Sequence, residues 1–120
     1  MLVLLGIAGP DSEEDVRYLA RKTADLRIFE DGDGKMNLSL RDTGGEMMVV
    51  SQFTLVADTR KGNRPGFGGA APPENAEPLY ELFVKEIKGQ GIGVKTGIFG
   101  AQMAVSLENK GPVTILLDSK

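Results

Sequence analysis

The chain has 120 residues, of which 41% are hydrophobic and 26% are charged, and its formal net charge is -3 at pH 7. This length predicts a single domain over residues 1–120, and the composition excludes a disordered chain. The excess of acidic residues argues against DNA as a partner and against broad binding to RNA, because such binding needs many lysine and arginine contacts to phosphate.

The sequence contains neither cysteine nor histidine. Disulfides, thiolate nucleophiles, Ser-His-Asp or Cys-His catalysis and the usual zinc sites are therefore excluded. The longest apolar stretch, residues 1–5, is too short for a membrane span and lacks the basic start of a secretion signal. We expect a cytoplasmic protein with no cofactor, no metal and no membrane partner.

The first elements predicted are a buried strand and an amphipathic helix. Residues 2–5 are apolar and are stopped by Gly6, which is typical of a short core strand. Ser12 and Asp15 have the spacing of a capping box, so a helix is expected to begin there. Apolar and small side chains then recur at helical spacing and predict one buried stripe: Val16, Leu19, Ala20 and Thr23.

A hairpin and a longer strand follow. Residues 26–29 and 36–40 flank an Asp-Gly-Asp-Gly turn and predict two antiparallel strands. Asp31, Asp33 and Asn37 also suggest a calcium loop, but the full motif and its closing glutamate are missing, so a turn is preferred. Residues 47–55 begin as an apolar run and end with interleaved polar groups, which predicts a central strand with a functional far end.

The second half begins with a Gly- and Pro-rich loop over residues 57–73 and a helix that starts at Pro73 and ends near Gly89. Three further strands are then predicted, over residues 94–96, 104–107 and 113–117, with a turn at residues 109–111 between the last two. Many strands beside only two helices predict an α+β domain with both helices packed on one side.

Several stretches, taken in order, resemble the D-aminoacyl-tRNA deacylase family. They are LRIFED (26–31), GKMNLSL (34–40), SQFTL (51–55), ADTRKG (57–62), GAAPP (69–73) and NKGPVT (109–114). The resemblance runs from Leu2 to the end of the chain. It implies a sheet-rich fold of β/β/α layers and hydrolysis of the ester in D-aminoacyl-tRNA, with mischarged glycyl-tRNA as a further substrate.

The resemblance also implies a homodimer with its active site at the subunit interface. Gly111 and Pro112 of one protomer would reach into the site of the other as a cis dipeptide. Their two carbonyl oxygens would receive the α-ammonium of the substrate, while the backbone would crowd the direction of an L side chain. Selection would then work by rejection, and D-amino acids and glycine would be admitted.

For the chemistry, the resemblance assigns Thr54 as the catalytic or positioning residue, surrounded by Ser51, Gln52 and Phe53. A threonine nucleophile needs a base, and the sequence offers no histidine. We therefore favour a site in which backbone N–H groups near Phe53 and Thr54 stabilise the oxyanion, assisted by the 2′-hydroxyl of the terminal adenosine or by water. Without the resemblance, Ser51 and Thr54 would be read as ordinary strand residues.

The tRNA acceptor end is the expected partner. Arg60, Lys61 and Arg64 would contact its phosphates, although a solvated loop is an almost equal alternative. Phe99 and Met103 would wall the adenosine site, and core packing is at least as good an interpretation.

The family's chains begin earlier, with a strand and hairpin before the segment that matches Leu2, so we expect a shortened or late-started form of lower stability. A non-catalytic module that binds an RNA end or a protein is therefore the main alternative to the hydrolase. A metabolite-binding protein that uses the glycine-rich loop over residues 62–69 ranks last, because no nucleotide-binding fingerprint is present.

Overall fold

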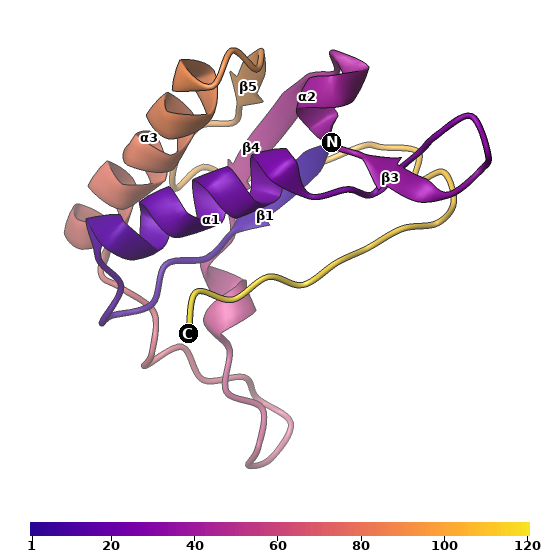
Figure 1. Cartoon of the computed structure of the whole chain (residues 1–120). Helices are drawn as coiled ribbons and strands as arrows, with labels where there is room; N and C mark the ends of the chain where they lie inside the picture. The colour runs from indigo at the N-terminus through magenta and orange to yellow at the C-terminus, as the bar shows by residue number, and fades with distance from the viewer.

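Three parallel strands form the centre of the computed structural model, which describes residues 1–120. They are β1 (Leu2–Leu5), β4 (Met47–Ser51) and β5 (Val94–Thr96), in the order β1-β4-β5. Leu5 lies opposite Ser51, and Met47 lies opposite Val94, so all three strands run in one direction. Parallel neighbours need crossover connections, which here contain the two long helices (Figure 1).

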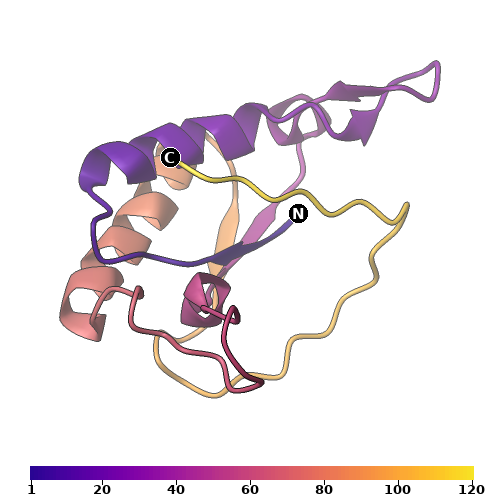
Figure 2. The same ribbon diagram turned by 90° about the horizontal axis from the view of Figure 1, so that it is seen from below.

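The two long helices, α1 (Glu13–Asp25) and α3 (Pro73–Gly89), pack against each other and on the same face of the sheet (Figure 2). Both predicted helices are confirmed. The backbone N–H of Ser12 donates to the carboxylate of Asp15 over 2.9 Å, as the capping box requires. The α+β class with helices on one side is therefore confirmed.

None of the helices combines the length and the apolarity that a bilayer crossing requires.

The core lies between the helices and one face of the sheet. Phe83 and Ile87 of α3 are 1% and 0% exposed, and burying a side chain of this size contributes about 1.5–3 kcal/mol. The other face of the sheet is not covered in this way, since Leu4 and Met48 are 44% and 40% exposed. The buried side chains that sheet and helices contribute to the core include Leu5, Met47, Val49, Val16, Ala20, Ala24, Tyr80, Phe83 and Ile87.

The predicted hairpin is present but shorter, with β2 (Phe29–Glu30) antiparallel to β3 (Met36–Leu38). The Asp31 carboxylate accepts the backbone N–H groups of Asp33 and Lys35 over 2.8 and 3.0 Å, as expected for a turn. The predicted strand over residues 36–40 is wrong at its end. Ser39 caps a short helix, α2 (Leu40–Thr43), because its hydroxyl accepts the Asp42 N–H.

The strand predicted over residues 47–55 is wrong beyond Ser51. The N–H of Gln52 still donates to the carbonyl of Leu5 over 2.8 Å, and a 3₁₀ helix, η1 (Phe53–Val56), follows. The N–H groups of Leu55 and Ala57 bond back to the carbonyls of Gln52 and Thr54. Local hydrogen bonds replace the ladder here because β1 ends at Leu5 and offers β4 no further partner.

The strands predicted over residues 104–107 and 113–117 are also wrong. The chain after β5 forms no regular element, and it travels around the molecule as an extended segment (Figures 1 and 2). Leu107, Ile115 and Leu116 are 60%, 52% and 86% exposed. Their β-propensity reflects how well such side chains fit a sheet surface, and no sheet edge of this chain pairs with them.

A buried hydrogen bond fastens α3 to the middle of β4. The hydroxyl of Tyr80 donates to the carbonyl of Val49 over 2.8 Å, and Tyr80 is only 5% exposed. We expect Tyr80→Phe to lower the free energy of unfolding by about 1–2 kcal/mol, because the carbonyl loses this donor where water cannot replace it. Urea denaturation with an unchanged m-value measures this effect.

The same residue gives an expectation for pH. Burial raises the pKa of the Tyr80 phenol above 10.0, and a hydrogen bond with Thr96 opposes part of this rise. Since the unfolded chain then loses its proton first, the contribution to stability is complete below the unfolded pKa of about 10 and is lost as the pH rises through the folded pKa. The phenylalanine variant should lack this part of the decline. An equal alkaline loss of stability in both proteins would contradict the assignment.

Candidate active site

The predicted catalytic residues gather where β4 ends. Ser51 and Gln52 are half-buried at the edge of the sheet, and η1 turns Phe53 and Thr54 outward, so that both are exposed. The side-chain amide of Gln52 donates a hydrogen bond to the hydroxyl oxygen of Thr54. Thr54 therefore uses its oxygen as an acceptor and keeps its hydroxyl proton free to donate toward a substrate.

This arrangement does not prepare Thr54 for nucleophilic attack. A threonine nucleophile needs a neighbouring base that takes its proton, and an amide nitrogen cannot do so. No lysine or carboxylate hydrogen-bonds to the Thr54 hydroxyl, whose only side-chain partner is Gln52. The geometry suits a group that orients a substrate or a water molecule.

Two backbone donors lie beside this hydroxyl. The N–H groups of Phe53 and Thr54 make no backbone hydrogen bond, because they belong to the first turn of η1 and the residues three positions earlier lie in the extended strand β4. Adjacent unpaired N–H groups can stabilise an oxygen that becomes negatively charged during ester cleavage. The end of β4 is thus followed by one hydroxyl and two amide donors on two adjacent residues.

An aromatic contact joins η1 to the Gly- and Pro-rich loop. The rings of Phe53 and Phe67 meet edge to face, with centroids 5.0 Å apart and planes at 70°. The loop is also tied to the segment after β1, since the N–H of Gly9 donates to the carbonyl of Gly69 over 2.9 Å. Phe67 was not predicted from the sequence, because a lone aromatic among glycines carries no periodic signal.

The three predicted RNA contacts lie together at the tip of this loop. Two backbone hydrogen bonds of 2.7 and 2.9 Å between Asp58 and Gly66 close its base. Arg60, Lys61 and Arg64 are exposed on the closed segment. The Asp58 carboxylate accepts Nε and Nη2 of Arg60 over 2.9 and 2.6 Å, and this guanidinium holds the pKa of Asp58 below its usual range.

The Gly111–Pro112 peptide bond is cis, as the resemblance implied. The turn around it is held by Asn109, whose side chain accepts the Val113 N–H over 3.3 Å and donates to the Thr114 hydroxyl over 3.2 Å. Gly111 and Pro112 are both exposed. No hydrogen bond links this turn to residues 51–54 of the same chain, and the meeting of the two predicted parts of the site stays a prediction.

The two residues predicted to wall an adenosine site lie after β5. Phe99 packs against the core and is tilted against Tyr80, with ring centroids 5.9 Å apart. Met103 is 39% exposed and lies against Gly97. Their contact with adenosine stays a prediction. No group of three or more carboxylates is arranged to hold a metal ion.

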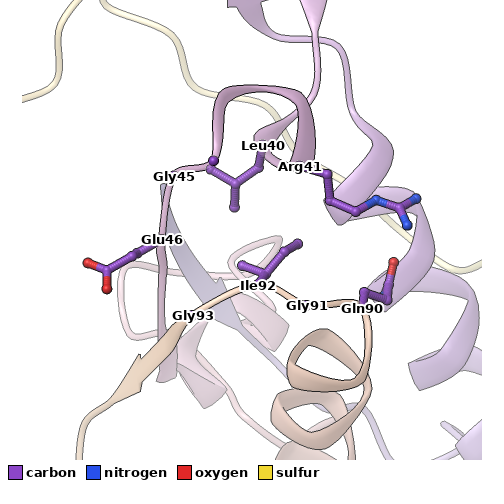
Figure 3. A pocket seen from close by; sticks show the side chains of 9 residues that line it. Leu40, Arg41, Gly45, Glu46, Gln90, Gly91, Ile92 and Gly93 are labelled. Atoms are coloured by element: carbon purple, nitrogen blue, oxygen red, sulfur yellow. The ribbon is translucent and has the colours of Figure 1, made fainter.

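A hollow of about 530 Å³ lies at the opposite end of β4 from the predicted site (Figure 3). The side chains of Leu40 and Ile92 point into it, whereas that of Glu46 points away. The guanidinium of Arg41 on its rim is paired with Asp25. Because β4 separates Glu46 from Ser51 by about 16 Å, this hollow cannot serve residues 51–54. Its lining is Leu40, Arg41, Gly44, Gly45, Glu46, Gln90, Gly91, Ile92 and Gly93.

The close approach of Gly6 to η1 positions the candidate site. A Cβ atom on Gly6 would lie 3.0 Å from Cβ of Leu55 and 3.2 Å from the carbonyl oxygen of Gln52. We expect Gly6→Ala to push η1 outward and to speed amide hydrogen exchange at residues 55–57. Gly32→Ala is the matched control, because nothing lies within 4 Å of its Cβ position. Equal exchange in both variants would contradict the packing constraint.

Comparison with known proteins agrees with the fold and the motifs. The model of the D-Tyr-tRNA(Tyr) deacylase family matches residues 1–118. The chain is 62% identical over 120 residues to a D-aminoacyl-tRNA deacylase of Desulfatibacillum aliphaticivorans, covering 100% of this chain and 82% of that one. It is 60% identical over 119 residues to the D-aminoacyl-tRNA deacylase of Roseiflexus sp. (strain RS-1), covering 99% of this chain and 77% of the relative.

Two solved structures share the fold. The c-Myc DNA unwinding element binding protein superposes with a TM-score of 0.88 at 42% identity, over 95% of this chain and 78% of that chain. A protein described as a probable eukaryotic D-amino acid tRNA deacylase superposes with a TM-score of 0.76 at 16% identity, over 91% and 79% of the two chains, which shows likeness of fold alone. Motifs, family model and high-identity relatives agree, and this chain belongs to the D-Tyr-tRNA(Tyr) deacylase family.

Proposed function

We propose that this chain hydrolyses the ester that joins a D-amino acid, or glycine, to the 3′ end of tRNA. The observation that carries the proposal is the end of β4 in a member of this family, where Phe53 and Thr54 are exposed and their amide N–H groups make no backbone hydrogen bond. The reaction releases free amino acid and tRNA. It corrects mischarged tRNA in the cytoplasm, where translation takes place.

The chain's own groups position the aminoacyl ester and stabilise the oxyanion that forms on it. The carbonyl of the aminoacyl ester lies against the Phe53 and Thr54 amides, which stabilise the oxyanion formed when water attacks its carbon. The ester C–O bond then breaks, and the 3′ oxygen of the tRNA takes a proton. The water, or the 2′-hydroxyl of the terminal adenosine, moves this proton, because no imidazole or thiol is present.

The substrate is selected in a homodimer, in which Gly111 and Pro112 of one protomer enter the site of the other. Their carbonyls accept the α-ammonium group, and their backbone leaves no room for an L side chain. Two observations support an assembly of this kind. The Gly111–Pro112 turn is exposed and makes no hydrogen bond to residues 51–54 of its own chain, and apolar Leu4 and Met48 are exposed on the sheet face away from the helices.

The tRNA acceptor end is held by Arg60, Lys61 and Arg64. They lie on a closed loop that Phe67 joins to Phe53, so phosphate contacts on the loop set the position of the ester at the end of β4. A few such contacts suffice to fix the register of a single RNA end, even on a chain with a net charge of -3.

Release of amino acid from charged tRNA tests the function directly. We expect rapid release from D-tyrosyl-tRNA and glycyl-tRNA and none above background from L-tyrosyl-tRNA. The reason is that the selecting backbone excludes an L side chain and admits the other two substrates. Binding of tRNA without release of any amino acid would instead identify a non-catalytic RNA-end module.

Substitutions separate the role of Thr54 in ester cleavage from the role of Gly111 in substrate selection. Thr54→Ala should keep kcat/KM within about tenfold of the wild type, whereas loss of a nucleophile would lower it by several orders of magnitude. Gly111→Ala should reduce the preference for D over L substrates. Gly111 has φ of +126°, and an added Cβ would lie 2.9 Å from the Val113 side chain, so this backbone must shift. A collapse of turnover in Thr54→Ala that Thr54→Ser restores would overturn this division.

A further inference from the structure

One carboxylate takes three hydrogen bonds from a single arginine. Asp58 accepts the backbone N–H of Arg60 over 3.0 Å, its Nε over 2.9 Å and its Nη2 over 2.6 Å. Lys61 and Arg64, the other cations of this loop, form no salt bridge, whereas Arg60 is bound to the carboxylate on one edge of its guanidinium. The three cations that were predicted together from the sequence are therefore not equivalent.

The other edge of this guanidinium remains available. A guanidinium carries five N–H donors in a rigid plane, and Asp58 takes Nε and one donor of Nη2, so the donors of Nη1 and the second donor of Nη2 are left. The Arg60 side chain is 87% exposed, compared with 50% for Asp58, so the free edge lies on the side of the solvent. Two parallel donors on one edge match the geometry of a phosphate group.

The backbone of Asp58 is fixed at the base of the loop. Its N–H and carbonyl both bond to Gly66, which closes the base of the loop, and Gly62 turns the tip with φ of +66°. An exposed ion pair adds little to the stability of a fold. The main effect of the Asp58–Arg60 pair is therefore to fix the direction of the guanidinium. Without the pair, the guanidinium would rotate about four side-chain bonds.

We propose that Asp58 is a positioning residue that aims the free edge of Arg60 at a phosphate of the bound tRNA acceptor end. The inference rests on the proposed function and adds a role for a carboxylate on a surface that binds a polyanion. Lys61 and Arg64 act there as freely moving charges. The Asp58 carboxylate does not touch the RNA and acts only through Arg60.

The direction of the effect separates this role from simple electrostatics. A carboxylate near phosphates repels them, so its neutralisation should strengthen RNA binding if its charge were all that mattered. A positioning role predicts that the same change weakens RNA binding. We expect Asp58→Asn to raise the KM for D-tyrosyl-tRNA by about three- to fivefold, the size of an exposed ion-pair contribution, and to leave kcat unchanged.

Four further variants complete the test. Asp33→Asn removes the same charge from the exposed hairpin turn, where the side chain forms no salt bridge, and should not raise KM. Arg60→Ala should raise KM at least as much as Asp58→Asn, and the double variant should show no further rise, because both changes remove one contact. Arg60→Lys keeps the charge but not the planar fork, and it should also raise KM.

The same proteins are compared for equilibrium binding of uncharged tRNA, which can be read whether or not amino acid is released. We expect Asp58→Asn to weaken binding and to make the plot of log K against log salt shallower by about one, as for loss of one phosphate contact. If Arg60→Ala weakens binding while Asp58→Asn leaves it unchanged or strengthens it, Asp58 has no positioning role. If the wild type binds tRNA as described but releases no amino acid, the proposed hydrolysis fails and the role of Asp58 stands.

Discussion

The end of the pairing between β1 and β4 is the constraint on which the candidate site depends. The last bond of this ladder joins the Gln52 N–H to the Leu5 carbonyl over 2.8 Å, and beyond it β4 has no partner on that side. Gly6 follows at once and leaves room for η1, since a side chain there would meet Leu55. The chain can therefore turn sharply, which exposes Thr54 and leaves two amide groups unpaired.

Helix α3 supports the end of β4 from the face of the sheet that the helices cover. Tyr80 holds the carbonyl of Val49, two residues before Ser51, and the same ring contacts Phe99. The polar end of β4 is thus attached to a buried core, although its own residues are half-buried or exposed. Sites on the ends of rigid strands hold their geometry better than sites on free loops. This rigidity matters for the proposed site, in which amides and a hydroxyl would take the place of imidazole and thiol.

Those parts of the fold that local pattern determines could be predicted from the sequence. Each of these parts is indicated by a pattern within a short stretch of sequence: the apolar stripe on α1, the helical spacing of apolar residues in α3 and the Asp-Gly turn of the hairpin. The end of β4 could not be predicted, because residues 52–55 have strand-like composition and turn only where β1 stops. The last two predicted strands failed for a related reason, since propensity does not show whether a partner edge exists.

The candidate site divides in the same way. Ser51, Gln52, Phe53 and Thr54 could be predicted as site residues because polar groups interrupt an apolar run, and the family motifs pointed to the same residues. Phe67 and Asp58 were missed, because their importance comes from contacts across the loop: an aromatic edge against Phe53 and a carboxylate against Arg60. An aspartate two residues before an arginine is too common a pattern to indicate such a role by itself.

We propose that this chain breaks an RNA-linked ester by positioning and by backbone donors, without forming a covalent intermediate. The most direct measurement is intact-protein mass spectrometry on samples quenched during a single turnover of D-tyrosyl-tRNA. We expect the mass of the unmodified chain at every time point while free D-tyrosine accumulates. A transient species heavier by one aminoacyl group, with the added mass located on Thr54, would contradict the claim.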